Sequence, residues 1–184
     1  MMIRCFDILL SGLGLVVIAP LLIVVLLLGW FDTGAPLFKQ IRVGRLQVPF
    51  VIIKFRTMSL DTKSVATHLT DKNAVTRFGS FLRRSKIDEL PQLWNVFMGN
   101  MSMVGPRPNL PNQVELIRER QRLGIYQWRP GITGLAQIEG VDMSTPQQLA
   151  LIDKQMLDQL SLNLYFKIIF LTVRGRGLGD RVRS

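Results

Sequence analysis

Two adjacent carboxylates, Asp88 and Glu89, are the side chains best suited to chemistry in this chain. A cationic run precedes them, and Arg107 follows them, held between two prolines in the segment 105–108. An ionised carboxylate among arginines can bind the metal ion of a phosphorylated substrate, or can itself attack phosphorus. Adjacent acids also serve as plain caps at a helix start, where they interact favourably with the helix dipole. The segment 82–108 is therefore the candidate site, with capping as the alternative role.

The residues that follow the carboxylates predict a short helix. Its apolar face consists of Leu90, Leu93, Trp94 and Phe97, at helical spacing. Gly99 is placed to end this helix. Two starts compete, with either Ser85 or Asp88 as the N-cap. Pro91 favours the later start, because a proline is tolerated in a first turn but costs about 3 kcal/mol in a helix interior. We therefore expect Asp88 and Glu89 to open a helix, whose unpaired N–H groups suit carboxylates and phosphates.

The composition favours a membrane surface as the partner of this chain. Its 184 residues carry a formal net charge of +10, yet the mean hydropathy is +0.25. Soluble basic proteins that bind nucleic acid are rarely so apolar, whereas cations beside an apolar segment are attracted to anionic lipid. The single cysteine, Cys5, excludes an internal disulfide and a cysteine-based zinc site, which fits a reducing compartment. The length suits one domain plus an anchor.

Residues 8–31 contain no charge and are numerous enough to cross a hydrocarbon core of ~30 Å as a straight helix. A single span is the default interpretation; a cleaved signal peptide is disfavoured because the apolar run is long and no A-x-A site follows it. Pro20 interrupts the middle of the run and predicts a bend. The basic residues after the run indicate that its C-terminal side is cytoplasmic, and the side of the N-terminus stays open.

The remainder of the chain predicts a small mixed domain. Residues 37–43 and 48–55 read as strands joined at Gly44-Arg45, a β-hairpin that would carry Lys54 and Arg56 toward the site, unless these are solvated edge charges. Residues 61–76 are polar and irregular and include His68, the only histidine. A Ser-His-Asp relay is disfavoured, because no G-x-S-x-G elbow is present.

Three further segments complete the predicted domain. Residues 112–122 predict a helix with Val114 and Ile117 inward and Gly124 as its stop. Thr145-Pro146 is a helix start, followed by apolar residues on one face. Residues 162–173 are apolar nearly all round but too short to span a bilayer, so we expect them to be buried or interfacial.

Read together, several segments resemble the bacterial sugar transferase family, the small monotopic phosphoglycosyl transferases. They occur in the family's order and cover nearly the whole chain. The segments are RCFD at 4–7, KFRTM at 54–58, DELPQLWNV at 88–96, VGPRP at 104–108 and RPGITGLAQ at 129–137.

The resemblance implies an α+β fold on the cytoplasmic face of a bacterial inner membrane. Residues 1–32 would form a re-entrant membrane helix-hairpin, and residues 33–184 a mainly helical cytoplasmic domain with a short β-hairpin and interfacial amphipathic helices. Many relatives carry Ser-Pro at the bend where this chain has Ala19-Pro20. Larger relatives carry additional membrane helices or a further domain, so we expect a minimal catalytic unit that contacts phospholipid and is compatible with a homodimer.

The resemblance also implies a covalent mechanism. Asp88 would attack the β-phosphate of a UDP-sugar and release UMP, and the sugar phosphate would pass to polyprenyl (undecaprenyl) phosphate, the first membrane step of glycoconjugate synthesis. Glu89 would assist as base or metal ligand, with Mg²⁺, or Mn²⁺, held by both carboxylates. The implied substrate-binding residues are Lys54, Arg56, Arg83, Pro106, Arg107, Pro108, Gly131 and Thr133.

Two other functions remain open at this point. A membrane-anchored basic module could hold anionic lipid or another polyanion without chemistry, and a metal-dependent membrane phosphatase could use water as the acceptor. The sugar is also open, because residues 140–144 read GVDMS where many relatives have Gly-Arg. An N-acetylated hexosamine is our expectation for it.

Overall fold

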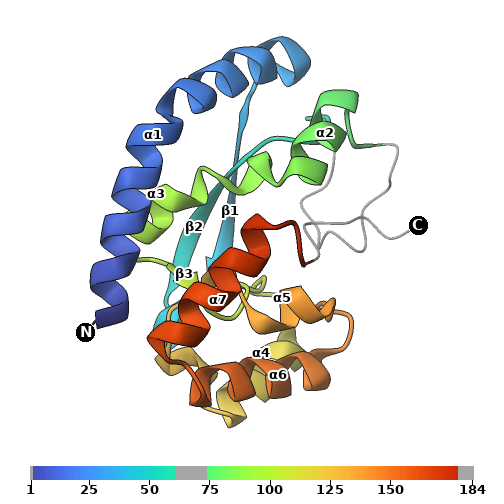
Figure 1. Ribbon diagram of the computed structural model, residues 1–184. Helices are drawn as coiled ribbons and strands as arrows, with labels where there is room; N and C mark the ends of the chain where they lie inside the picture. Colours follow the sequence, from blue (N-terminus) through green and yellow to red (C-terminus); the bar gives the residue numbers. More distant parts are fainter. Residues whose placement is uncertain (1, 61–73, 178–184) are drawn as a thin grey trace.

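A computed structural model describes residues 2–60 and 74–177, so His68 lies outside the described residues. Helix α1, Met2–Thr33, takes up the whole uncharged run as one continuous helix of 32 residues with Pro20 inside it. Its ribbon bends along its course in Figure 1, as expected where a proline removes a backbone hydrogen bond. In the described part of the chain it is the one helix long and apolar enough to cross a membrane. The re-entrant hairpin stays a prediction.

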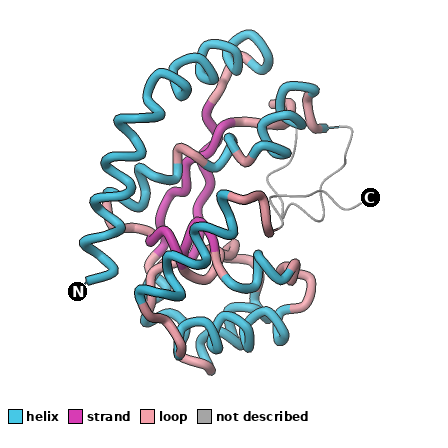
Figure 2. Tube along the Cα trace, viewed as in Figure 1, coloured by secondary structure: helices cyan, strands magenta, loops and turns pink. Residues whose placement is uncertain are grey.

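The predicted β-hairpin is confirmed. Strand β1, Leu37–Val43, pairs antiparallel with β2, Pro49–Phe55, from Leu37 opposite Phe55 to Val43 opposite Pro49. The connection is longer than the predicted turn, since a 3₁₀ turn η1, Arg45–Gln47, follows Gly44. The hairpin lies through the middle of the molecule between α1 and the later helices (Figure 2).

The segment around the two carboxylates differs from the prediction. Helix α2, Arg77–Ser85, was not expected; Thr76 caps it, since its hydroxyl accepts a hydrogen bond from the Gly79 N–H. Lys86 then adopts a left-handed conformation, φ 58°, and ends α2. A 3₁₀ turn η4, Ile87–Glu89, leads into α3, Gln92–Phe97.

The prediction that Asp88 and Glu89 open the helix is therefore wrong. Both lie in η4, one turn ahead of α3. Ser85 is not an N-cap either, because it is the last residue of α2 and its hydroxyl donates to the Phe81 carbonyl. The left-handed conformation of Lys86 separates the two helical segments. The sequence does not predict this conformation, since a non-glycine residue rarely adopts a positive φ.

A second small sheet joins distant parts of the chain. Strand β3, Ser102–Val104, pairs in parallel with β4, Gly131–Thr133. Between them lie α4, Val114–Arg122, and the 3₁₀ turn η5, Ile125–Gln127; after them come α5, Leu135–Glu139, α6, Pro146–Asp158, and α7, Leu162–Val173. The mixed α and β fold is thus confirmed, and so is the start predicted for α6 at Thr145-Pro146. Helix α7 coincides with the apolar run 162–173.

The main core lies among α4, α6 and α7, where Leu116, Met156, Tyr165 and Ile168 are buried. The inward face of α4 was predicted incorrectly. Val114 is exposed, and Leu116 and Arg120, four residues apart, are the buried ones. A prediction based on apolar residues alone does not place an arginine in the interior.

Both ends of α1 pack on the same folded domain. Near its start, Asp7 is 2% exposed and its Oδ1 accepts hydrogen bonds from the Ser102 hydroxyl, the Met103 N–H and the Tyr165 hydroxyl. Near its other end, Val25 is buried against Phe55 and Leu82, with Leu22 and Leu26 packed around this cluster. The two ends of α1 are therefore both fixed to the domain that contains the hairpin.

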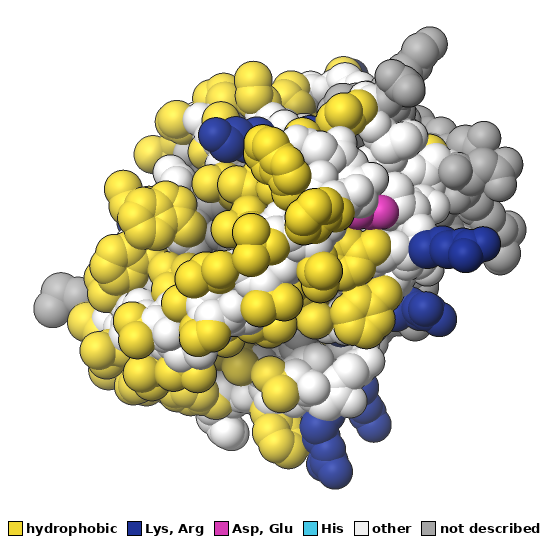
Figure 3. Space-filling view, turned by 90° about the horizontal axis from the view of Figure 1, so that it is seen from above, with side chains coloured by type: hydrophobic (Ala, Val, Ile, Leu, Met, Phe, Trp, Pro, Cys, Tyr) yellow, Lys and Arg dark blue, Asp and Glu magenta, His cyan; other side chains and the backbone are white. Residues whose placement is uncertain are grey.

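The outer face of α1 remains apolar and uncovered. Figure 3 shows hydrophobic side chains over much of the face seen from above, with lysines and arginines toward one edge. Exposed apolar residues of α1 and α3 include Leu13, Val16, Val17, Ile23, Val24, Leu27, Phe31, Trp94, Phe97 and Met98. An exposed apolar surface of this extent indicates contact with a membrane or another protein.

Candidate functional site

Asp88 and Glu89 lie in a buried turn rather than on a solvated helix end. Their residues are 3% and 7% exposed. The turn is closed by backbone hydrogen bonds from the Glu89 N–H to the Lys86 carbonyl, 3.2 Å, and from the Leu90 N–H to the Ile87 carbonyl, 3.1 Å. Burial of two neighbouring carboxylates requires compensating charge, because an isolated ion loses several kcal/mol of hydration.

Two cations from different parts of the chain converge on Glu89. The Lys54 Nζ lies 3.4 Å from the Glu89 Oε1, and an Arg107 guanidinium nitrogen lies 2.5 Å from the same oxygen. Lys54 comes from the end of β2, while Arg107 follows β3. The arrangement joins two cations with one carboxylate beside Asp88, which suits the binding of an anionic phosphate.

Asn95 fixes the strand that carries Lys54. Its side-chain Oδ1 accepts from the Ile53 N–H, and its Nδ2 donates to the Val51 carbonyl. Asn95 is 3% exposed, so its amide is bonded to the strand from within the fold. The residue was not singled out from the sequence, because an amide in a short helix gives no sign of the strand that it will contact.

The other two predicted cations, Arg83 and Arg56, both contact groups at the ends of the hairpin strands. The Arg83 Nε donates to the Thr57 hydroxyl at 2.7 Å, just beyond the end of β2. The Arg56 guanidinium donates to the carbonyls of Ala35 and Leu37 and lies over the Phe38 ring. The structure therefore brings Lys54 and Arg107 to the carboxylates, while Arg56 is bound to the backbone at the start of β1.

The predicted substrate-binding residues Pro106, Pro108, Gly131 and Thr133 surround the backbone of Arg107. The Gly131 N–H donates to the Pro106 carbonyl at 2.9 Å, and the Gly105 N–H donates to the Thr133 carbonyl at 2.9 Å. The Thr133 hydroxyl lies 2.7 Å from that of Thr172 in α7. In this structure Gly131 and Thr133 therefore support the segment that presents Arg107.

Close approach explains the glycine at position 131. A Cβ atom there would lie 2.1 Å from the Gly105 nitrogen, a distance that no side chain tolerates. Gly105 faces the same restriction from the other strand, since its own Cβ would lie 2.6 Å from the Arg129 carbonyl oxygen. Because neither residue has a Cβ atom, the backbone at Gly105 can contact the backbone at Gly131.

The donor set of the site fits a hard divalent cation. Within residues 2–60 and 74–177, no group of three or more metal-ligating side chains is found. Asp88 and Glu89 nonetheless supply carboxylate oxygens, and Mg²⁺ commonly binds one or two carboxylates together with substrate phosphates and water. The site therefore fits a metal ion that arrives with a phosphorylated substrate.

Comparison with known proteins agrees with the resemblance noted in the sequence. Residues 1–176 match the bacterial sugar transferase family. The uncharacterized sugar transferase EpsL of Bacillus subtilis is 42% identical over 77% of this chain and 70% of EpsL. The undecaprenyl-phosphate glucose phosphotransferase of Komagataeibacter xylinus is 40% identical over 93% of this chain.

The matched proteins differ in length. The chain covers 35% of the Komagataeibacter xylinus protein, whereas it covers 96% of the exopolysaccharide production protein PSS of Rhizobium leguminosarum bv. phaseoli, at 37% identity over 95% of this chain. The similarity thus extends over the carboxylate pair, both cationic partners and the apolar helix. The chain belongs to the bacterial sugar transferase family.

Proposed function

We propose that this chain is a phosphoglycosyl transferase that moves a sugar 1-phosphate from a UDP-sugar to a polyprenyl phosphate, through a covalent intermediate on Asp88. The observation that carries the proposal is the buried Asp88–Glu89 pair, on which Lys54 and Arg107 converge from separate segments. The Komagataeibacter xylinus relative is an undecaprenyl-phosphate glucose phosphotransferase by name, which supports the same reaction class.

The first step forms an acyl phosphate. An Asp88 carboxylate oxygen attacks the β-phosphorus of the UDP-sugar, and the bond from that phosphorus to the bridging oxygen breaks, so that UMP leaves with the electron pair. In the second step an oxygen of the polyprenyl phosphate attacks the same phosphorus and displaces the Asp88 carboxylate. The product is a polyprenyl diphosphate sugar, and the enzyme is regenerated.

Lys54 and Arg107 would stabilise the charge that develops on the transferred phosphoryl group. Both are already held at the site by Glu89, so they need little rearrangement when substrate binds. Asp88 and Glu89 would hold Mg²⁺, which neutralises phosphate charge when bound. The burial of the carboxylates also keeps bulk water from the acyl phosphate, which favours transfer over hydrolysis.

The membrane placement we propose is monotopic, with both ends of α1 on the cytoplasmic side. A straight span would separate its ends by a hydrocarbon core of ~30 Å. Here Asp7 near one end and Val25 toward the other are both buried against one domain. This supports a bent helix that enters one leaflet and returns, with the exposed apolar residues of α1 and α3 in lipid.

The test is a product assay with membranes that contain the protein, a panel of labelled UDP-sugars and polyprenyl phosphate. We expect one sugar to give UMP and a lipid-extractable product, and we expect EDTA to abolish both until Mg²⁺ is restored. Release of UDP would exclude the mechanism. Release of free sugar phosphate at full rate without lipid acceptor would instead identify a phosphatase.

A further inference from the structure

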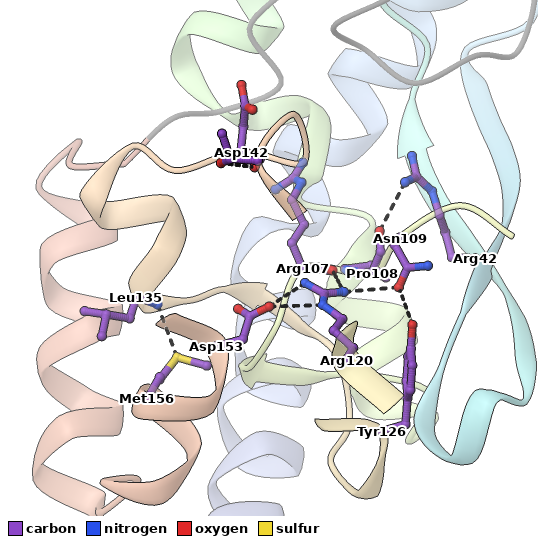
Figure 4. Close-up of polar contacts among 11 residues, drawn as sticks. Arg42, Arg107, Pro108, Asn109, Arg120, Tyr126, Leu135, Asp142, Asp153 and Met156 are labelled. Carbon is purple, nitrogen blue, oxygen red and sulfur yellow. Dashed lines mark hydrogen bonds and ion pairs between the residues drawn. The ribbon is translucent and has the colours of Figure 1, made fainter. Parts of the chain in front are cut away.

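A buried polar cluster lies beneath the segment 105–109, which carries Arg107. Arg120 of α4 and Asp153 of α6 are each 2% exposed, and the Arg120 Nε and one terminal nitrogen both donate to the Asp153 Oδ2. The other terminal nitrogen donates to the Arg107 carbonyl at 2.8 Å and to the Asn109 Oδ1 at 3.1 Å. Figure 4 shows this guanidinium between Asp153 and the loop.

Three consecutive carbonyls of the loop are fixed by three different groups. The Arg120 guanidinium donates to the Arg107 carbonyl. The Arg42 guanidinium donates to the Pro108 carbonyl at 3.1 Å. The Val43 N–H donates to the Asn109 carbonyl at 3.0 Å. Helix α4 and strand β1 therefore hold the loop from two sides. Such a loop can hold the Arg107 side chain in a single direction.

Tyr126 of η5 completes the cluster. Its hydroxyl donates to the Asn109 Oδ1 at 3.0 Å, beside the bond from Arg120. Burial raises the pKa of Tyr126 above its ordinary value, and the opposing effect of the Arg120 charge is smaller, so the hydroxyl stays protonated and available as a donor. Asn109 is 0% exposed, and its carboxamide oxygen is thus shared by two buried donors.

A buried ion pair contributes little net stability to a core. Desolvation of two charges offsets much of their attraction, and well-packed apolar residues at such positions are often as stable. Burial also raises the pKa of the Asp153 carboxyl, which reflects this desolvation even with Arg120 beside it. What a hydrophobic pair could not supply is the hydrogen bond to the Arg107 carbonyl and the bond to Asn109.

From this geometry we infer that Arg120, oriented by Asp153, is a positioning residue for Arg107. Arg120 lies in the core and contacts the backbone carbonyl of Arg107, while the Arg107 side chain reaches Glu89 at 2.5 Å. Loss of Arg120 would leave Arg107 in the chain but free to turn away from the site. This inference rests on the proposed function, in which Arg107 contacts the transferred phosphate.

The test is a double-mutant cycle on the rate of UMP release from the UDP-sugar. The combined substitution Arg120→Met with Asp153→Leu removes the ion pair without leaving a buried charge unpaired. We expect it to lower kcat/KM by about tenfold or more in the wild-type background, and by less than about threefold when Arg107→Lys is already present. The matched control replaces the exposed pair of α4, Arg122→Met with Glu119→Leu, and should leave the rate unchanged in both backgrounds.

A merely structural role gives a different pattern. A smaller folded fraction would lower the rate by the same factor in both backgrounds, and that result would overturn the inference. If the Arg120–Asp153 variant does not fold, Tyr126→Phe decides the question by the same cycle, because it removes one hydroxyl from Asn109 and keeps the core filled. Absence of UMP release from the wild-type protein would refute the proposed function instead, so the two failures are distinguishable.

Discussion

At the scale of residues, the site is built on one shared carboxylate oxygen. The Glu89 Oε1 accepts from both Lys54 and Arg107, and this gathers two cations beside Asp88 before any substrate binds. The bond from Arg107 is a short charge-assisted hydrogen bond, and the arginine adds a planar set of donors that lysine lacks. Glu89 thus orients the cations, and Asp88 is left as the nucleophile in the proposed reaction.

The first prediction concerns the shape of the Arg107 side chain. Arg107→Lys keeps the charge but removes the guanidinium fork, so kcat/KM for UMP release should fall on the order of tenfold to a hundredfold. Arg118→Lys, on the exposed side of α4, is the matched control and should leave the rate unchanged. A lysine variant of Arg107 as active as wild type would show that Arg107 does not clamp the phosphate.

At the scale of elements, the position of Arg107 depends on the parallel pairing of β3 with β4. The pairing requires Gly131 and Gly105 to touch. We expect Gly131→Ala to lower the free energy of unfolding by about 2 kcal/mol or more, because the added methyl group meets backbone that cannot move aside. Chemical denaturation followed by tryptophan fluorescence would measure the change.

The control for that substitution is Gly12→Ala. A Cβ at position 12 would lie 3.4 Å from the Phe97 ring, an ordinary contact, and alanine is the better helix former inside α1. This variant should be at least as stable as wild type. Equal destabilisation by both substitutions would argue against a special role for the contact between Gly105 and Gly131.

Elements with a local sequence signal could be predicted, and those set by long-range contacts could not. Residue patterns, together with helix-start signals such as Thr145-Pro146, predict the β-hairpin, α1, α6 and α7. The turn that contains Asp88 depends on the positive φ of Lys86, and the pairing of β3 with β4 joins segments about thirty residues apart. The ion pair of Arg120 with Asp153 lies in the core, where periodicity predicts apolar residues.

The same limit applies within the candidate site. Asp88, Glu89, Lys54 and Arg107 could be named from residue type and from resemblance, and the structure brings all four together. The placement of Arg56 against the Ala35 and Leu37 carbonyls could not be predicted, because a strand pattern does not show which backbone groups the end of the strand will contact. Asn95 was missed for a related reason, since its partners lie on β2.

At the scale of the whole molecule, α1 is the described helix that is long and apolar enough to enter a membrane. Its two ends are fixed to that domain through Asp7 and Val25, and its outer face is apolar. In the proposed monotopic placement, the Asp88–Glu89 pair would lie in a domain that rests against the membrane surface. A polyprenyl phosphate, whose tail stays in lipid, could then present its head group to the site.

The topology prediction can be tested with single cysteines. The variant Cys5→Ser with Met2→Cys carries one thiol near the start of α1. In intact cells a membrane-impermeant thiol reagent should not label it, and after lysis it should. The further substitution Pro20→Ala should raise labelling from outside, because a straighter helix favours a full span. Strong labelling of intact cells without that substitution would show that α1 crosses the membrane.

Trapping of the covalent intermediate would show whether the sugar phosphate passes through Asp88. Purified protein would be mixed with a UDP-sugar that carries a radioactive β-phosphate, without lipid acceptor, then denatured and assayed for bound label. We predict up to one label per chain, a matching burst of UMP, and transfer of the label to lipid when polyprenyl phosphate is added. Asp88→Asn should hold no label and lose at least about a thousandfold in rate. Lipid product formed at full rate with no label on the protein, or by the asparagine variant, would exclude a covalent intermediate on Asp88.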